Sequence, residues 1–273
     1  MRRMSGFNVV SLTFGLAFLY LPMLILVIYS FNSSKLVTVW AGFSTKWYGE
    51  LLHNEAFLDA ALVTLKVGAI SSTLATVLGT MAAFLLVRLG RFSGRTLFSG
   101  MIYAPLVMPD VITGLSLLLL FIGINMDRGI TTIVLAHTTF AMCYVSVVVS
   151  SRLSSFDTSL EEAALDLGCT PWSAFRLVTL PIIAPAVISG WLLAFTLSLD
   201  DLVIASFTAG PSSTTLPMKI FSAVRLGVSP EINALSTLMI GIVAFGVVIF
   251  SIMSKRNTAL KLQEERDAVD GRT

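Results

Sequence analysis

The chain has 273 residues, of which 55% are hydrophobic and only 12% are charged, about half the charged fraction of an ordinary soluble domain. With a mean hydropathy of +0.87, this composition indicates that lipid surrounds much of the chain. The net charge of +2 provides no strong basic field for nucleic acid. Two separated cysteines and two histidines argue against a disulfide framework or a metal centre.

Uncharged stretches long enough to cross a bilayer recur along the chain, since a spanning helix needs about 20 apolar residues. In chain order they predict six transmembrane helices, over residues 8–30, 60–87, 97–123, 129–151, 180–205 and 232–254. The first stretch is longer than the apolar region of a signal peptide and has no clear cleavage site, so we expect an uncleaved helix. Within the third, Pro105 and Pro109 should bend the helix because each removes a backbone donor.

The lysines and arginines divide unevenly between the two sides of the membrane. Twelve of the 18 fall on the side that holds both termini. Cytoplasmic loops carry an excess of such residues, so we expect cytoplasmic termini, a cytoplasmic loop over residues 152–180 and a polar cytoplasmic tail over 255–273. The segments 32–58 and 206–230 then lie on the outer side. Asn32 is expected to cap the first helix.

Residues 152–180 are too polar to span the membrane and too regular to be a plain linker. Two overlapping capping boxes, Thr158 with Glu161 and Ser159 with Glu162, predict that a short helix begins there. Its end is marked by Gly168, which tolerates the left-handed conformation of a helix terminus. A threonine and a proline at 170 and 171 are then typical of the start of a second helix. The sequence therefore predicts a helix–turn–helix outside the bilayer.

The first short helix carries an apolar stripe with helical spacing, made of Leu160, Ala163, Ala164 and Leu167. Its two central residues are small, and small side chains let another surface approach closely. We expect this helix to be a docking element.

The pattern Glu-Ala-Ala, three residues, Gly, nine residues, Val-Thr-Leu-Pro resembles the EAA loop of ABC importer permeases. The matching residues are Glu162, Ala163, Ala164, Gly168, Leu180 and Pro181, and Val178 in place of isoleucine is the one departure. The resemblance implies an all-α ABC type I importer permease fold, with residues 1–273 forming a single transmembrane permease domain. It also implies that the loop seats in a groove of a separate ATP-binding subunit.

The sequence contains no G-x-x-x-x-G-K-S/T loop for binding nucleotide phosphates. We therefore expect ATP and Mg²⁺ to bind a partner ATPase, while this chain binds no cofactor. On this interpretation the chain is a transport subunit without catalytic residues of its own.

Three carboxylates fall within the predicted spans, at Asp110, Asp200 and Asp201. Each would cost about 2.5–3.5 kcal/mol at the centre of a membrane helix, so such groups normally face a cavity or a partner. No intramembrane lysine or arginine matches them, which favours a cationic substrate. The alternative is that they form hydrogen bonds between helices or lie near the outer water interface. His137 is expected to be a packing or hydrogen-bonding residue.

Asp200 and Asp201 are adjacent, and adjacent side chains of a helix point about 100° apart. Both therefore cannot face one cavity. One should face the pathway and the other a helix or subunit contact, and the sequence leaves open which does which.

Three further stretches, SFNSS at 30–34, APLVMPDVITG at 104–114 and SLDDLVIASF at 198–207, resemble the polyamine importer permeases, and their putrescine branch most of all. The resemblance implies a bacterial inner-membrane location and three partners: a second permease, an ATP-binding dimer and a periplasmic polyamine-binding protein. Spermidine or another small cation is the alternative substrate.

Two other functional classes compete with an importer permease. A single-chain secondary transporter would typically carry an internal repeat, and none is evident. An intramembrane aspartyl protease would use two aspartates as a dyad, but the Gly-x-Gly-Asp pattern typical of that class is missing.

Overall fold

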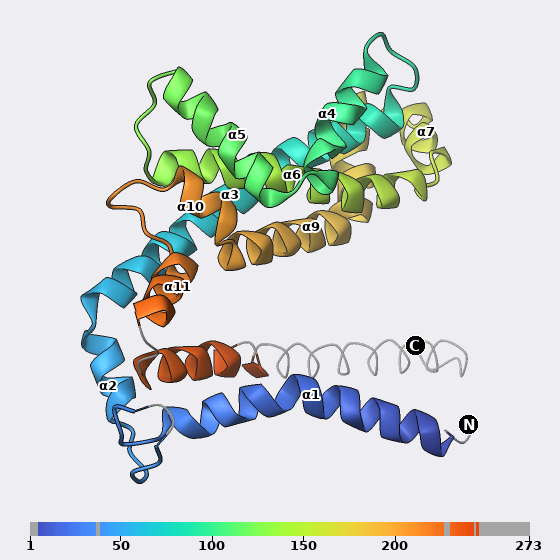
Figure 1. Ribbon diagram of the computed structural model, residues 1–273. Helices are drawn as coiled ribbons and strands as arrows, with labels where there is room; N and C mark the ends of the chain where they lie inside the picture. The colour runs from blue at the N-terminus through green and yellow to red at the C-terminus, as the bar shows by residue number, and fades with distance from the viewer. Residues whose placement is uncertain (1–4, 37–38, 227–229, 243, 246–273) are drawn as a thin grey trace. The chain divides into compact units, whose positions relative to one another are not determined.

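The computed structural model describes residues 5–36, 39–226, 230–242, 244 and 245, and every regular element in this part is a helix (Figure 1). The chain divides into two compact units. One contains residues 1–55 and 223–273, and the other contains residues 56–222. The predicted all-α architecture is thus observed throughout the described part.

The first unit contains α1 (Gly6–Ser30), α2 (Lys46–His53) and helical residues 230–242 and 244–245. Helix α1 begins after Ser5, whose hydroxyl accepts a hydrogen bond from the amide of Asn8 at 3.3 Å. The side-chain amide of Asn54, just after α2, donates to the Glu231 carboxylate at 3.1 Å. The bounds of α1 agree with the predicted first span, 8–30.

Asn32 was expected to cap α1, and this expectation is wrong. The C-cap of α1 is Phe31, and the Asn32 side chain turns instead into the loop that follows. There it accepts from the amide of Ala41 at 2.9 Å and donates to the carbonyl of Val39 at 2.7 Å. The indole of Trp47 donates to the Asn32 carbonyl at 2.6 Å. Asn32 is buried, and the hydrogen bonds within this loop satisfy its polar side chain there.

The second unit holds three long helices, α3, α6 and α9, and the shorter helices between and after them. In order they are α3 (Glu55–Arg88), α4 (Arg95–Val107), α5 (Asp110–Gly123), α6 (Ile130–Ser154), α7 (Ser159–Asp166), α8 (Pro171–Ala174), the π-helical turn η1 (Phe175–Thr179), α9 (Leu180–Asp200), α10 (Val203–Thr208) and α11 (Leu216–Leu226). The first residue of α3 and the last four residues of α11, 223–226, belong to the other unit.

Four helical segments in the described part are long and apolar enough to cross a membrane. They are Gly6–Ser30, Glu55–Arg88, Ile130–Ser154 and Pro171–Asp200. Helices α4 and α5 qualify only as a pair, and their axes turn by 118°. Residues 246–254 of the predicted sixth span, and the tail 255–273, lie outside the described residues, so the count of six spans stays a prediction.

The third span was predicted as one bent helix over 97–123. This prediction is wrong, because the chain forms two separate helices here, α4 and α5. The chain leaves helical geometry at Met108, whose φ of −81° and ψ of 135° are extended, and restarts after Pro109. A residue that precedes proline is pushed out of the helical region by the ring, which explains the break at this point.

The fifth span also differs from its predicted bounds, 180–205. It begins earlier, because α8, η1 and α9 run as one apolar helix from Pro171. It ends at Asp200, because Asp201 adopts an extended conformation. The chain then forms the separate short helix α10.

Small residues bring α3, α6 and α9 together in the core of the second unit. The buried side chains there are Ala75, Ala83, Ala141, Val145, Val149, Leu153, Ile183 and Ala194. A methyl group added at Gly79 would lie 2.6 Å from the carbonyl oxygen of Met142, so only glycine permits this crossing. Close helix approach through small residues is the usual packing mode inside membranes.

Candidate functional site

The loop between α6 and α9 folds into the predicted helix–turn–helix, but its first cap differs from the prediction. Thr158 occupies the N-cap position in a helical conformation, and its side chain makes no capping hydrogen bond. The carboxylate of Asp157 accepts from the amide of Ser159 at 3.0 Å instead. That hydrogen bond lowers the pKa of the Asp157 carboxyl. The predicted capping boxes are therefore wrong, because the residue just before them supplies the acceptor.

Gly168 ends α7 as predicted, in the left-handed conformation with φ of +87°. Its amide donates to the Leu165 carbonyl at 2.9 Å, and the next amide, of Cys169, donates to the Ala164 carbonyl at 3.1 Å. This pair of bonds is the Schellman arrangement that closes helix ends. The second helix then starts at Thr170, whose hydroxyl accepts from the Ser173 amide at 3.2 Å.

The apolar stripe of α7 faces away from the rest of this chain. Leu160 is 49% exposed and Leu167 is 87% exposed, while Ala163 is exposed and Ala164 is half-buried. Glu162, beside the stripe, is exposed as well. A run of uncovered leucines and alanines on a short helix is typical of a surface that another protein covers.

Contacts with the end of α3 hold α7 and the segments on either side of it in place. The Arg88 guanidinium lies 3.0 Å from the Glu161 carboxylate and 4.8 Å from the ring centre of Phe156. A second contact sets the ring of Phe84 edge-on against Phe175 of η1, at 5.2 Å. These pairs could not be predicted from the sequence, because the partners are some 70 to 90 residues apart.

The Leu-Pro end of the EAA pattern coincides with the π-helical turn. The amide of Leu180 donates to the carbonyl of Phe175, five residues back instead of four. Pro181 has no amide to donate, so the regular ladder cannot continue through it. Both Leu180 and Pro181 are exposed, while Thr179 before them is fully buried. The end of the motif thus coincides with a break in the regular α-helical hydrogen bonding between the loop and α9.

Asp110 is the first residue of α5 and is exposed. At this position the positive end of the helix dipole favours a carboxylate. Helix α5 packs closely on α10, since a methyl group at Gly114 would lie 2.6 Å from the Phe207 ring. The helix that starts with Asp110 therefore belongs to the same packed group as the helix that follows the aspartate pair.

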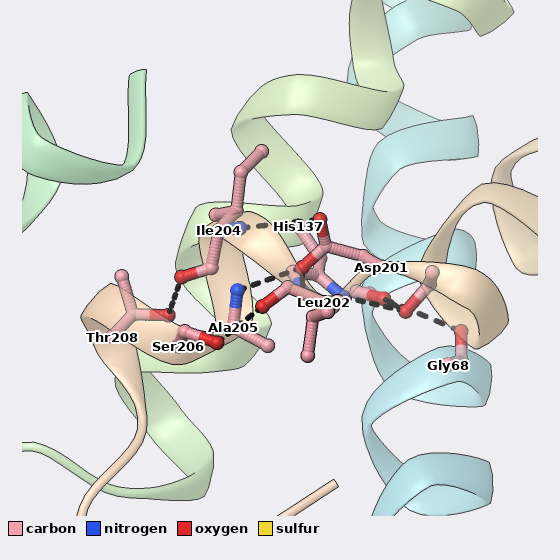
Figure 2. Close-up of polar contacts among 10 residues, drawn as sticks. Gly68, His137, Asp201, Leu202, Ile204, Ala205, Ser206 and Thr208 are labelled. Carbon is pink, nitrogen blue, oxygen red and sulfur yellow. Dashed lines mark hydrogen bonds and ion pairs between the residues drawn. The ribbon is translucent and has the colours of Figure 1, made fainter. Parts of the chain in front are cut away.

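Asp200 and Asp201 lie in unlike surroundings. Asp200 is the last residue of α9 and is exposed, and among the described residues its carboxylate has no side-chain partner. Asp201 is largely buried and accepts hydrogen bonds from the amides of Ile204 and Ala205, at 3.2 and 2.7 Å. It also lies 3.0 Å from the Nε2 atom of His137 (Figure 2).

His137 is a hydrogen-bonding residue, as expected, and it links three helices. Its Nδ1 atom lies 2.7 Å from the hydroxyl of Ser198 on α9. That hydroxyl accepts from Ser71 of α3 at 3.2 Å. The serines were not singled out from the sequence, since isolated serines in apolar stretches carry no pattern. Asp110 makes no hydrogen bond or ion pair with this group among the described residues.

Comparison with known proteins finds similar sequences among the permeases of polyamine transport systems. The putrescine transport system permease protein PotI of Escherichia coli (strain K12) is 63% identical over 252 residues, which cover 90% of this chain and 89% of that protein. The spermidine/putrescine transport system permease protein PotC of the same organism is 42% identical over 242 residues, covering 89% and 91%.

Among solved structures, a bacterial ABC transporter that imports the acidic polysaccharide alginate matches with a TM-score of 0.71. The match covers 91% of this chain and 94% of that one at 17% identity, and it shows a shared fold. The predicted ABC importer permease fold is thereby confirmed. A match of the family of binding-protein-dependent transport system inner membrane components extends over residues 75–258, which include the helix–turn–helix and all three aspartates. The chain therefore belongs to this family of inner membrane transport components.

Proposed function

We propose that this chain is a permease subunit of an ATP-driven ABC importer that moves putrescine from the periplasm to the cytoplasm. The observation that carries the proposal is the 63% identity to a putrescine permease over 90% of this chain. The family is one of inner-membrane transport components, which excludes both a protease and a secondary transporter as the function. The chain is a transport subunit and not an enzyme.

The proposed complex contains a second permease, a dimeric ATPase that binds ATP and Mg²⁺, and a periplasmic polyamine-binding protein. Dependence on a binding protein is a property of the family. The ATPase is required because this sequence has no phosphate-binding loop of its own. The uncovered stripe on α7 offers a surface for it.

Coupling to the ATPase is assigned to the loop between α6 and α9. In this proposal Glu162, Ala163 and Ala164 contact the ATPase, since they are exposed or half-buried on one short helix. Gly168 sets the angle between α7 and α8 through its left-handed backbone. Leu180 and Pro181 pass the movement on to α9, with which α8 is continuous.

The substrate pathway is assigned to Asp110 and to at least one of Asp200 and Asp201. A dication crossing a low-dielectric region needs countercharge, and a carboxylate within about 4 Å contributes roughly 4 kcal/mol at an effective dielectric of 20. Asp110 and Asp200 are exposed, and an exposed carboxylate in a membrane span is expected to meet water or a cation instead of lipid. The proposed orientation, with both termini cytoplasmic, follows the distribution of lysine and arginine.

The test is uptake by cells from which the gene for this chain has been deleted. Uptake of radiolabelled putrescine should be lost and should return with the wild-type gene. Spermidine, which is in the name of the 42% identical relative, is measured in parallel. Loss of spermidine uptake alone would make spermidine the substrate. Unchanged uptake of both would overturn the proposal.

A further inference from the structure

We propose that the two adjacent aspartates have different tasks: Asp201 is a positioning residue held by His137 and Ser198, and Asp200 is the carboxylate that meets the cationic substrate. This inference deepens the proposed function and rests on it. It also answers the question that the sequence leaves open, namely which aspartate faces the pathway.

Asp201 already accepts three hydrogen bonds within the chain. One carboxylate oxygen accepts from the Ala205 amide at 2.7 Å and from His137 at 3.0 Å, and the other accepts from the Ile204 amide at 3.2 Å. Only 11% of its side chain is exposed. These bonds replace the water that the charge has lost, so a passing cation would have to break them to gain Asp201.

The hydrogen bonds of His137 run in one direction. A carboxylate can only accept, so Nε2 carries the proton and donates to Asp201. In the neutral ring, Nδ1 then accepts from the hydroxyl of Ser198, whose oxygen in turn accepts from Ser71. Every donor in this series of hydrogen bonds has an acceptor, which fixes the tautomer and the orientation of the His137 ring. Helices α3, α6 and α9 each contribute one member.

This network sets the position of Asp200. Because Asp201 leaves the helix, with φ of −67° and ψ of 120°, and turns to the first amides of α10, helix α9 stops at Asp200. Asp200 is left exposed at a helix C-terminus, where the dipole disfavours a negative charge. Among the described residues it has no side-chain partner that relieves this charge. A cation at this point would do so.

Two substitutions at His137 separate positioning from simple packing. In His137→Gln the amide nitrogen can reach the place of Nε2 and still donate to Asp201, whereas in His137→Asn the shorter side chain can reach only Ser198. Both variants remove the imidazole ring. We expect His137→Asn to slow uptake by about tenfold or more in assembled transporter, as for loss of a hydrogen bond to a charged group, and His137→Gln to restore most of the rate. Equal loss in both variants would overturn the positioning role.

A second readout follows the exposure of position 200 without depending on the substrate. Asp200→Cys and Asp201→Cys are made separately in full complexes in which Cys143→Ala and Cys169→Ser leave no other cysteine in this chain. A cationic methanethiosulfonate reagent should modify the cysteine at 200 several times faster than that at 201. The labelling rate at 200 should change when His137→Asn is added and should hold when His137→Gln is added. Equal labelling at 200 and 201 would overturn the assignment.

The outcomes of these two experiments can be distinguished from a failure of the proposed function. If the wild-type complex does not transport putrescine, the proposed substrate is wrong, and the labelling contrast still tests the geometry. If putrescine is transported but Asp200→Asn takes it up at the wild-type rate in assembled transporter, Asp200 is not the group that meets it.

Discussion

Each of the three carboxylates occupies a different kind of residue environment. Asp110 lies at a helix N-terminus, where the dipole stabilises its charge, and Asp200 lies at a helix C-terminus, where the dipole opposes it. Asp201 is enclosed by hydrogen-bond donors. An amino-acid type alone therefore says little about which of them a cation can reach.

Asp110→Asn should slow putrescine uptake by about tenfold or more, because it removes a countercharge worth up to roughly 4 kcal/mol at close range. The complex should still assemble, since the dipole interaction lost at the start of α5 is only about 0.3–1 kcal/mol. Uptake is measured in complexes whose assembly has been checked by size-exclusion chromatography. Asp59→Asn, an exposed aspartate near the start of α3, is the matched control and should transport normally.

Normal uptake by Asn variants at all three positions, 110, 200 and 201, would contradict the pathway assignment. Selection by charge would then have to lie in the second permease or in the binding protein.

Gly168→Val should uncouple transport from ATP hydrolysis while leaving insertion into the membrane intact. The space around Gly168 is open, so the penalty comes from its φ of +87° and not from a clash with neighbours. A β-branched residue is strongly disfavoured there, whereas asparagine tolerates the left-handed region. Gly168→Asn is therefore the control and should keep most of the activity. The measurement is putrescine uptake per ATP hydrolysed, and equal behaviour of the two variants would mean that the turn conformation is not needed.

At the scale of elements, the π-helical turn fixes how α8 is rotated relative to α9. A π turn holds one residue more than the corresponding α turn, so its removal would rotate everything before it by about 100° about the helix axis. Trp172 of α8 is 70% exposed and stacks on Phe175 of η1. The turn therefore decides which side of α8 carries the exposed Trp172.

Pro181→Ala should allow the regular ladder to re-form and so misalign the loop, lowering uptake per ATP hydrolysed. Pro185→Ala, one turn further into the same helix, removes the same ring without touching the turn and should have a much smaller effect. Both prolines are replaced by a good helix former, so neither variant should lose stability from propensity. A larger defect at position 185 than at 181 would contradict this role for the turn.

At the scale of the whole molecule, orientation across the membrane is the property that links the loop to ATP. Residues 152–180 are predicted to be cytoplasmic from the lysine and arginine distribution. Ser173 lies in this loop, and Ser212 lies in the segment predicted to face the outside.

A cysteine introduced at Ser173 should be protected from a membrane-impermeant thiol reagent added to intact cells, and one at Ser212 should react. Cys143→Ala and Cys169→Ser again provide the background. After the cells are opened, the cysteine at 173 should react as well, which shows that it was shielded by the membrane and not by folding. Labelling of position 173 from outside would reverse the proposed topology.

The sequence alone determined those features that depend on local pattern. Runs of apolar residues predicted the four long helices that could cross a membrane, because a bilayer requires a minimum length of them. The spacing around Glu162, Gly168 and Pro181 predicted the short helices of this loop and the turn between them. These features can be predicted from the sequence because they depend on residues close together in the chain and not on the rest of the fold.

Tertiary structure decided the features that depend on which helices meet and how each is rotated. The break after Asp200 was hidden in an apolar run, because only the pairing of Asp201 with His137 and with the first amides of α10 ends the helix there. His137 and Ser198 are 61 residues apart, and no periodicity links them. The contact of Arg88 with Glu161 is of the same kind. Such pairs arise only when α3, α6 and α9 pack through their small residues, and this packing brings polar groups from distant parts of the chain within hydrogen-bonding distance.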